Sequence, residues 1–442
     1  MMKNKIYLTI LCCFLVTTAF NQSFNKTKMD SLFTILSEKN KAMGSVAISK
    51  KGEMVYNRSI GYASVKGEEK TPATTQTKYR IGSITKTFTA VIIFQLIEEK
   101  KLSLEDKLSM YFPTLPNADK ISIHNLLSHR SGLHSYTDDS LYLTYYTNPK
   151  TQKELIDILA VTAPDFEPGK KTQYSNSNFV VLGFIAEKLT QKTYSQLLAE
   201  RITNKINLKD TYIGDKINIG RNECYSFSYY NGWVAEPETD LSVSVGAGAI
   251  VSTTSDLVKF IEAVFTGKLV SDSSLAKMKT IREGLGMGMF RIPFYNRFGY
   301  GHNGSIDGFG STVVYFPKDS VAMAYCTNGQ VYPMNDILIG ILAIYFNGAY
   351  TIPAFDKINI SEADLDKYTG IYSSTQIPVK ITVSKEGITL TAQVTGQSKF
   401  PLEFDSKDVF KFDRAGVIME FRPEKNEFTL KQGGASYLFS KD

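Results

Sequence analysis

Ser83 and Lys86 are the two side chains of this sequence whose types and spacing predict covalent chemistry. They lie within residues 79–88, where a strand-like lead-in changes into an amphipathic helix. Residues three apart share one face of a helix, so the lysine amine can reach the serine hydroxyl. A serine hydroxyl is a weak nucleophile that needs a base, and a desolvated lysine with a lowered pKa can supply one. The pair predicts an enzyme that acylates its own serine at a helix N-terminus, where backbone N–H groups stabilise negative charge.

The spacing of these two residues is not informative by itself. Ser-x-x-Lys also occurs at Ser23–Lys26 and Ser274–Lys277, and a helix cap followed by a solvated lysine accounts for most such pairs. The information lies in an ordered set of further motifs. In chain order they are Leu126-Leu127-Ser128-His129-Arg130-Ser131-Gly132-Leu133, Pro168-Gly169, Tyr174-Ser175-Asn176 and His302-Asn303-Gly304.

This ordered set resembles the serine β-lactamase and penicillin-binding protein family, in particular its branch of class C β-lactamases, DD-peptidases and esterases. The resemblance spans about residues 25–350. Two positions depart from the superfamily's Ser-x-x-Lys, Ser-Asp-Asn and Lys-Thr-Gly set. Tyr174 replaces the serine of the second motif, and His302 replaces the lysine of the third.

The resemblance implies catalytic roles for the first two motifs. Ser83 is the acylated nucleophile, and Lys86 and Tyr174 form the base pair that takes its proton and later activates water. A tyrosine with a pKa near 10 could act as a base only if neighbouring cations stabilise its phenolate. Asn176 is expected to hydrogen-bond a substrate amide and Lys86.

The resemblance also implies roles for the third motif. His302 would reach Tyr174 or a substrate carboxylate from an edge strand, and Gly304 would let the substrate backbone approach that strand. The backbone N–H groups of Ser83 and Ser305 would form the oxyanion hole.

Histidine at position 302 is largely neutral at pH 7, whereas a lysine there offers a carboxylate a fixed positive charge. His-x-Gly is familiar in the DD-peptidase and aminopeptidase members of the branch, so the resemblance implies a serine hydrolase working through an acyl-enzyme on Ser83, a D-amino-acid-specific peptidase or carboxypeptidase or a related amidase. The alternatives are an esterase or weak class C-like β-lactamase with the same residues, and a catalytically inactive binding or scaffold protein.

In this family context we interpret His129 as a structural residue under the active-site loop. Trp233 lines the cleft or packs in the core, and the sequence leaves both open.

Alternating apolar and polar residues predict a hairpin over residues 45–57 and two strands over residues 308–325, followed by a helix over residues 336–346. Helical spacing dominates between them. One antiparallel sheet built from both chain ends, flanked by helices and carrying a helical insertion, is an α+β fold. Short alternating strands over residues 368–442 predict a small antiparallel β-barrel, which the resemblance describes as lipocalin-like. We therefore predict three units: a signal peptide over residues 1–20, the hydrolase domain over residues 21–355 and the barrel over residues 360–442.

The N-terminus predicts export. Lys3 and Lys5 precede an apolar run from Ile6 to Val16 that is short for a membrane span, and small or polar residues follow it. The location is therefore periplasmic or secreted. A lipidated Cys12 or Cys13 is the alternative, which the lack of a small residue ahead of them disfavours.

The remaining composition points to a small-molecule or peptide substrate. The chain has 442 residues, 43% of them hydrophobic and 21% charged, with a net charge of +6. Its basic residues are scattered, so nucleic acid is not an expected partner. Neither the cysteines nor the four histidines have metal-ligand spacing, and we expect no metal and no cofactor. Cys224 and Cys326 could pair in an oxidising compartment, although independent thiols are the favoured interpretation.

Overall fold

The computed structural model describes residues 24–230, 232–355, 362–387, 389–397, 399–412, 415–433 and 435–442. The predicted signal peptide and Cys12 and Cys13 lie outside this part of the chain. No helix in the described ranges is both long enough and apolar enough to span a bilayer.

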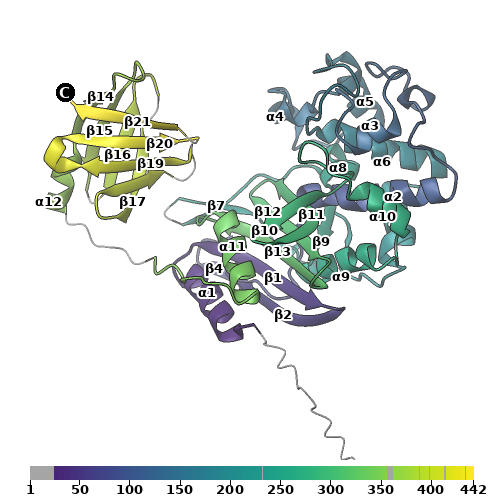
Figure 1. The fold of residues 1–442 in the computed structure, drawn as a ribbon, viewed down its shortest axis with the longest axis horizontal. Helices are drawn as coiled ribbons and strands as arrows, with labels where there is room; N and C mark the ends of the chain where they lie inside the picture. The colour runs from purple at the N-terminus through teal and green to yellow at the C-terminus, as the bar shows by residue number, and fades with distance from the viewer. Residues whose placement is uncertain are drawn as a thin grey trace, which may run out of the picture.

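The main sheet joins the two ends of the catalytic region (Figure 1). Its strand order is β10-β11-β12-β13-β1-β2, and β1 pairs antiparallel with β13. The strands are β1 (Ala42–Lys50), β2 (Glu53–Ile60), β10 (Phe290–Phe294), β11 (Arg297–Ile306), β12 (Phe309–Phe316) and β13 (Val321–Gln330). The predicted sheet built from both chain ends is therefore confirmed.

Helices cover both faces of this sheet because its strands alternate between two apolar faces. Met323 and Tyr325 of β13 pack on one face with helices α1 (Lys26–Glu38) and α11 (Met334–Tyr345). Ala324 and Cys326 face the other core. That core contains helices α2 (Thr85–Glu98), α6 (Asn176–Thr190) and α9 (Thr254–Phe265).

The segment between β2 and β10, which contains α2, α6 and α9, also carries shorter helices and several short strands. The helices are α3 (Ile123–Leu127), α4 (Tyr142–Tyr145), α5 (Gln152–Val161), α7 (Tyr194–Leu198), α8 (Val245–Gly248) and α10 (Asp272–Met278). The strands are β3 (Tyr62–Lys66), β4 (Glu69–Pro72), β5 (Tyr79–Arg80), β6 (Tyr212–Ile213), β7 (Phe227–Tyr229), β8 (Trp233–Ala235) and β9 (Ile250–Ser252). A π-helical turn, Ala199–Thr203, directly follows α7.

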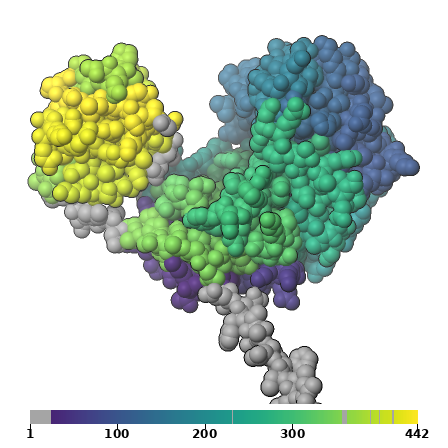
Figure 2. All heavy atoms as spheres, viewed as in Figure 1, coloured from purple at the N-terminus to yellow at the C-terminus, as the bar shows by residue number. Residues whose placement is uncertain are grey.

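The C-terminal region forms a closed barrel of strands β14 to β21. The strands are β14 (Gly370–Ser373), β15 (Lys380–Glu386), β16 (Thr389–Val394), β17 (Phe400–Ser406), β18 (Val409–Phe412), β19 (Val417–Arg422), β20 (Glu427–Gln432) and β21 (Ala435–Lys441), and the short helix α12 (Glu362–Leu365) precedes them. Its core includes Tyr372, Phe410, Phe428 and Phe439, all buried. Figure 2 shows the barrel, in yellow, as a rounded mass. Side chains fill an eight-stranded barrel of this size, so its interior serves as a hydrophobic core.

Candidate active site

Ser83 lies between strand β5 and helix α2, in a 3₁₀ turn over Gly82–Ile84. Gly82 has a φ of +48°, and a β-carbon there would lie 2.8 Å from the Ser305 carbonyl oxygen. A side chain at this position would push the turn away from strand β11. Glycine lets the nucleophile turn pack directly on β11, while Ser83 itself stays partly exposed.

Gly304 makes the matching close approach from the strand. A β-carbon at Gly304 would lie 2.0 Å from the Ile81 carbonyl oxygen. Ser311 Oγ donates to the same carbonyl at 2.8 Å. The sequence predicted Gly304 for the approach of a substrate backbone. In the structure, its close neighbour is the protein's own nucleophile turn.

Lys86 is fully buried and reaches three oxygen atoms. Its Nζ lies 2.9 Å from Ser83 Oγ, 2.7 Å from Asn176 Oδ1 and 2.8 Å from the Ala247 carbonyl oxygen. Burial holds the pKa of Lys86 well below its ordinary value, because an ammonium loses its solvation there. A neutral amine has two N–H groups and one lone pair. The Asn176 and Ala247 oxygens accept the two N–H groups, so the lone pair faces the Ser83 hydroxyl.

Tyr174 brings a phenol to the same serine from the loop before helix α6. Burial raises the pKa of Tyr174 above its ordinary value, although a hydrogen bond with the Ser83 side chain lowers it. Lys86 Nζ lies 5.0 Å from the centroid of the Tyr174 ring. The sequence analysis required a phenolate if Tyr174 were to act as a base. The structure favours a neutral phenol, which suits Tyr174 to carrying a proton after Lys86 has taken it.

Asn176 begins helix α6 and links Lys86 to the insertion. Its Nδ2 donates to Thr137 Oγ1 at 2.8 Å, and its backbone N–H donates to Ser135 Oγ at 3.2 Å. These bonds leave Oδ1 to face Lys86. Sequence analysis missed Ser135 and Thr137, whose only signal was a run of polar residues soon after the Leu126–Leu133 block.

His302 lies on β11 with 1% of its surface exposed. Its ring centroid is 6.2 Å from that of Tyr174 and 4.1 Å from that of Phe290. Nδ1 lies 2.5 Å from the Asn303 carbonyl oxygen, so Nδ1 carries the proton and Nε2 is an acceptor. Nε2 is buried without a hydrogen-bond partner in the described ranges. Burial and the nearby Lys86 lower the pKa of His302 to about 3, so the ring is neutral at pH 7.

Strand β11 is an edge strand over only half of its length, and His302 is the first residue of that half. Strand β10 pairs with it from Arg297 to Gly301. From His302 to Ile306, the described strands pair with β11 on the β12 side alone. Ser305 lies on this open stretch, and its backbone nitrogen would be 2.9 Å from a β-carbon on Gly82. Its N–H group is therefore held beside the nucleophile turn.

The family model described as Beta-lactamase matches residues 30–343, which include every side chain of the site described above. The chain belongs to the beta-lactamase family. Penicillin-binding proteins, a D-amino acid amidase and a D-alanine hydrolase are among its relatives, so this beta-lactamase-family protein is a serine hydrolase.

Two curated relatives are similar to this hydrolase over different lengths. Penicillin-binding protein 4* of Bacillus subtilis (strain 168) is 26% identical over 452 residues, covering 95% of this chain and 97% of the relative. Teichoic acid D-alanine hydrolase of Staphylococcus aureus (strain MRSA252) is 27% identical over 296 residues, covering 65% of this chain and 71% of the relative.

Two solved structures are similar in fold. D-amino acid amidase from Ochrobactrum anthropi SV3, complexed with D-phenylalanine, gives a TM-score of 0.65 at 25% identity, covering 73% of this chain and 99% of that one. The octameric penicillin-binding protein homologue from Pyrococcus abyssi gives a TM-score of 0.67 at 23% identity, covering 94% of this chain and 100% of that one. The second similarity concerns the fold alone and extends into the C-terminal barrel.

His129 supports Tyr174 in this beta-lactamase-family site. The two rings stack with centroids 4.5 Å apart and an interplanar angle of 24°. His129 Nδ1 accepts the Ser175 N–H at 3.1 Å. Burial holds the pKa of His129 well below its ordinary value. The neutral ring therefore holds the loop that carries the phenol.

The Ala247 carbonyl was missed by sequence reasoning, because a backbone acceptor has no side-chain signature. The signal that could have found it is the small-residue run Val245–Gly248. A β-carbon at Gly246 would lie 2.6 Å from the Phe179 carbonyl oxygen. The run therefore packs tightly on helix α6 and brings the Ala247 carbonyl to Lys86.

The other residues singled out in the sequence lie apart from this chemistry. Trp233 lies on strand β8, and its ring packs against Gly329 and Tyr229. Cys224 and Cys326 are buried free thiols, the favoured interpretation.

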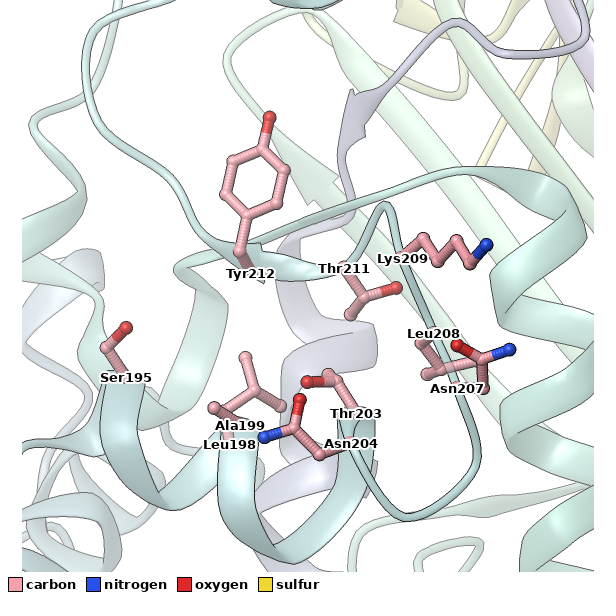
Figure 3. A pocket seen from close by; sticks show the side chains of 10 residues that line it. All are labelled: Ser195, Leu198, Ala199, Thr203, Asn204, Asn207, Leu208, Lys209, Thr211 and Tyr212. Carbon is pink, nitrogen blue, oxygen red and sulfur yellow. The ribbon is translucent and has the colours of Figure 1, made fainter.

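A cavity of about 500 Å³ lies between helix α7, the π-helical turn and strand β6 (Figure 3). Ser195 and Lys209 stand on opposite sides of it, and none of the predicted catalytic residues lines it. In the described ranges no group of His, Cys, Asp and Glu side chains could hold a metal ion.

Proposed function

We propose that this serine hydrolase cleaves amides of D-amino acids, as an amidase or a D-amino-acid-specific peptidase, through an acyl-enzyme on Ser83. The observation that carries this proposal is the neutral, buried His302 in the place of the family's lysine. A lysine there would attract a carboxylate beside the scissile bond, whereas an uncharged ring favours a substrate without one. The D-amino acid amidase and the teichoic acid D-alanine hydrolase among the relatives support the D configuration.

Acylation begins at the amine of Lys86. Its lone pair takes the Ser83 proton while Oγ attacks the substrate carbonyl carbon. The N–H groups of Ser83 and Ser305 hold the resulting oxyanion. One such donor typically lowers the activation barrier of the chemical step by about 3 kcal/mol. Tyr174 gives its phenolic proton to the leaving amine and recovers one from the Lys86 ammonium.

Deacylation reverses these proton transfers. A water replaces the departed amine and attacks the acyl carbon, giving one proton to Tyr174 while Tyr174 passes its own phenolic proton to the Lys86 amine. The second tetrahedral intermediate collapses to the free D-amino acid, and Ser83 recovers its proton. His302 Nε2 is the acceptor that can hold the phenol or the water in line, because its Nδ1–H is already bound to the Asn303 carbonyl.

Export belongs to the same proposal. The predicted signal peptide at residues 1–20 would send the enzyme to the periplasm or the medium, where D-amino-acid derivatives of the cell wall are found. Cell fractionation of the full-length protein, with N-terminal sequencing of the mature chain, tests this. A mature chain that retains Lys3 and Lys5 would contradict it.

A substrate panel tests the activity. The full chain and Ser83→Ala are assayed on D-alanine p-nitroanilide, its L isomer, N-acetyl-D-alanyl-D-alanine, p-nitrophenyl acetate and a chromogenic cephalosporin. We expect the D-anilide to give the highest kcat/KM relative to its uncatalysed rate, and Ser83→Ala to be inactive. Faster turnover of the carboxylate-bearing dipeptide or the cephalosporin would overturn the amidase assignment. No labelling of Ser83 by a fluorophosphonate would favour the scaffold alternative.

A further inference from the structure

A buried ion pair joins the two segments that carry the N–H groups of the proposed oxyanion hole. Arg80, on strand β5, is three residues before Ser83 and has 3% of its surface exposed. Asp307 follows strand β11, two residues after Ser305, and its side chain is 1% exposed. Arg80 Nη1 donates to Asp307 Oδ2 at 3.1 Å. The nucleophile turn and the strand wall of the site are therefore tied together by opposite charges.

The guanidinium of Arg80 also reaches three other oxygen atoms. Nη1 donates to the Thr239 carbonyl at 2.6 Å. Nη2 donates to the Asp215 carbonyl and to Glu238 Oε2, both at 3.0 Å. A guanidinium presents its donors as a rigid planar fork, so these acceptors fix its orientation as well as its position. The shorter, rotating ammonium of a lysine could not keep all of these contacts.

The carboxylate of Asp307 is held on its other oxygen as well. Oδ1 accepts the Thr239 N–H at 3.0 Å and the Thr239 hydroxyl at 2.6 Å. Burial raises the pKa of Asp307, and the Thr239 hydrogen bonds and the charge of Arg80 oppose that rise. Asp307 has a φ of +52°, a backbone conformation that favours glycine. The turn alone would suit glycine better, so the contacts of the carboxylate are what the aspartate adds there.

We infer that Arg80 and Asp307 are positioning residues, whose ion pair sets the separation of the two oxyanion donors. The inference rests on the proposed function, since it concerns the oxyanion formed on Ser83. The same two segments touch at Gly82, where a β-carbon would lie 2.9 Å from the Ser305 nitrogen. This backbone contact limits how close the segments come, and the ion pair limits how far they move apart.

The test measures kcat and KM for D-alanine p-nitroanilide in full-length Arg80→Met, Asp307→Gly and the double variant. Asp307→Gly removes the carboxylate and suits the turn, so backbone strain cannot explain a loss. Each single variant should lose about 10²-fold in kcat, the effect of misplacing a group by about 1 Å, while KM stays within about threefold. The double variant should lose at most about tenfold more than either single one, because both substitutions break the same pair.

A boronic acid separates positioning from stability. Phenylboronic acid forms a tetrahedral adduct with Ser83 Oγ, and one of its oxygens takes the place of the oxyanion. Its affinity should therefore fall in parallel with kcat. Each kcat is expressed per site that a fluorophosphonate labels, which removes the contribution of unfolded protein. Arg58→Met is the matched control, because it breaks the 3.1 Å ion pair of Arg58 with Asp30 between β2 and α1, and it should change neither quantity.

Unchanged kcat and boronic acid affinity in the single variants, or equal losses in Arg58→Met, would overturn the inference. If a single variant does not fold, Arg80→Lys and Asp307→Asn keep a polar group at each position and should still lose at least about tenfold in kcat. Failure of the proposed function has a different signature, since the wild type would then not turn over the D-anilide. In that case p-nitrophenyl acetate probes the same oxyanion, and equal kcat in wild type and Asp307→Gly would still overturn the positioning role.

Discussion

The active site has two walls that hold their groups in different ways. The helical wall, made of Lys86, Tyr174 and Asn176, presents side chains that hydrogen bonds and ring stacking fix in place. The strand wall, residues 302–306 of β11, presents backbone N–H groups and a neutral imidazole. In the proposed mechanism, proton transfer therefore depends on side chains of the helical wall, whereas one of the two oxyanion donors, the Ser305 N–H, belongs to the backbone of the strand wall. Substitutions on the two walls should therefore lower the activity in different ways.

Removing the base of the helical wall should have the largest effect. Lys86→Met keeps the length of the side chain and removes its lone pair, so kcat/KM should fall about 10³-fold while the fold is retained. Activity on the D-anilide measures the fall in kcat/KM, and circular dichroism checks that the fold is retained. Lys277→Met is the matched control, because Lys277 belongs to a second Ser-x-x-Lys motif and is exposed on α10. If Lys86→Met kept a tenth of the wild-type activity, Lys86 would not be the general base.

A substitution on the strand wall should act through geometry. Gly304→Ala places a β-carbon 2.0 Å from the Ile81 carbonyl, so the nucleophile turn and β11 must separate. Loss of one oxyanion donor lowers kcat about 10²-fold. Unlike the Lys86 substitution, this one should also lower the thermal unfolding midpoint. Gly232→Ala, with no atom near its added β-carbon, should change neither quantity. A normal kcat in Gly304→Ala would show that the close packing of the two segments is unnecessary.

The sequence predicted the helical wall better than the strand wall for a physical reason. Lys86, Tyr174 and Asn176 belong to short motifs whose side chains carry the proposed chemistry. The Ala247 carbonyl and the close contact at Gly82 arise from backbone atoms that tertiary packing brings together, so no side-chain pattern marks them.

The same reasoning explains which strands were found. The strands predicted over residues 45–49 and 53–57 lie within β1 and β2, and those predicted over 308–316 and 320–325 begin one residue before β12 and β13. Strand β11 contains Gly299, Gly301 and Gly304 and little alternation, so its extended form depends on pairing with β12. In the barrel, alternating residues predict β15, β16 and β18 to β21 but not β14 and β17. Helical spacing predicts a helix over residues 194–201, but α7 ends at Leu198, where the π-helical turn begins.

Adding charge to the strand wall should change selectivity more than rate. His302→Lys restores a cation where the third motif of the family has one, and a hydrogen bond to a charged group contributes about 1.5–3 kcal/mol. Acylation by penicillin, which carries a carboxylate, should therefore rise about tenfold or more. Turnover of the uncharged D-anilide should not rise. His302→Gln is the neutral control, and equal penicillin acylation in both variants would show that charge at position 302 does not select the substrate.

The pH dependence of kcat/KM should show whether the group that titrates is Lys86 on the helical wall or His302 on the strand wall. Acid protonates the Lys86 amine and removes the lone pair, so kcat/KM should fall as pH drops through the lowered pKa of Lys86. On the alkaline side, activity should persist to at least pH ~10, since burial raises the pKa of Tyr174 above the ordinary value of a phenol. His302, with a pKa of about 3, stays neutral throughout this range. His302→Gln should therefore leave the midpoint of the acid limb within about 0.5 pH unit of the wild type. Loss of that acid limb in His302→Gln would show that the titrating group is His302 and not Lys86.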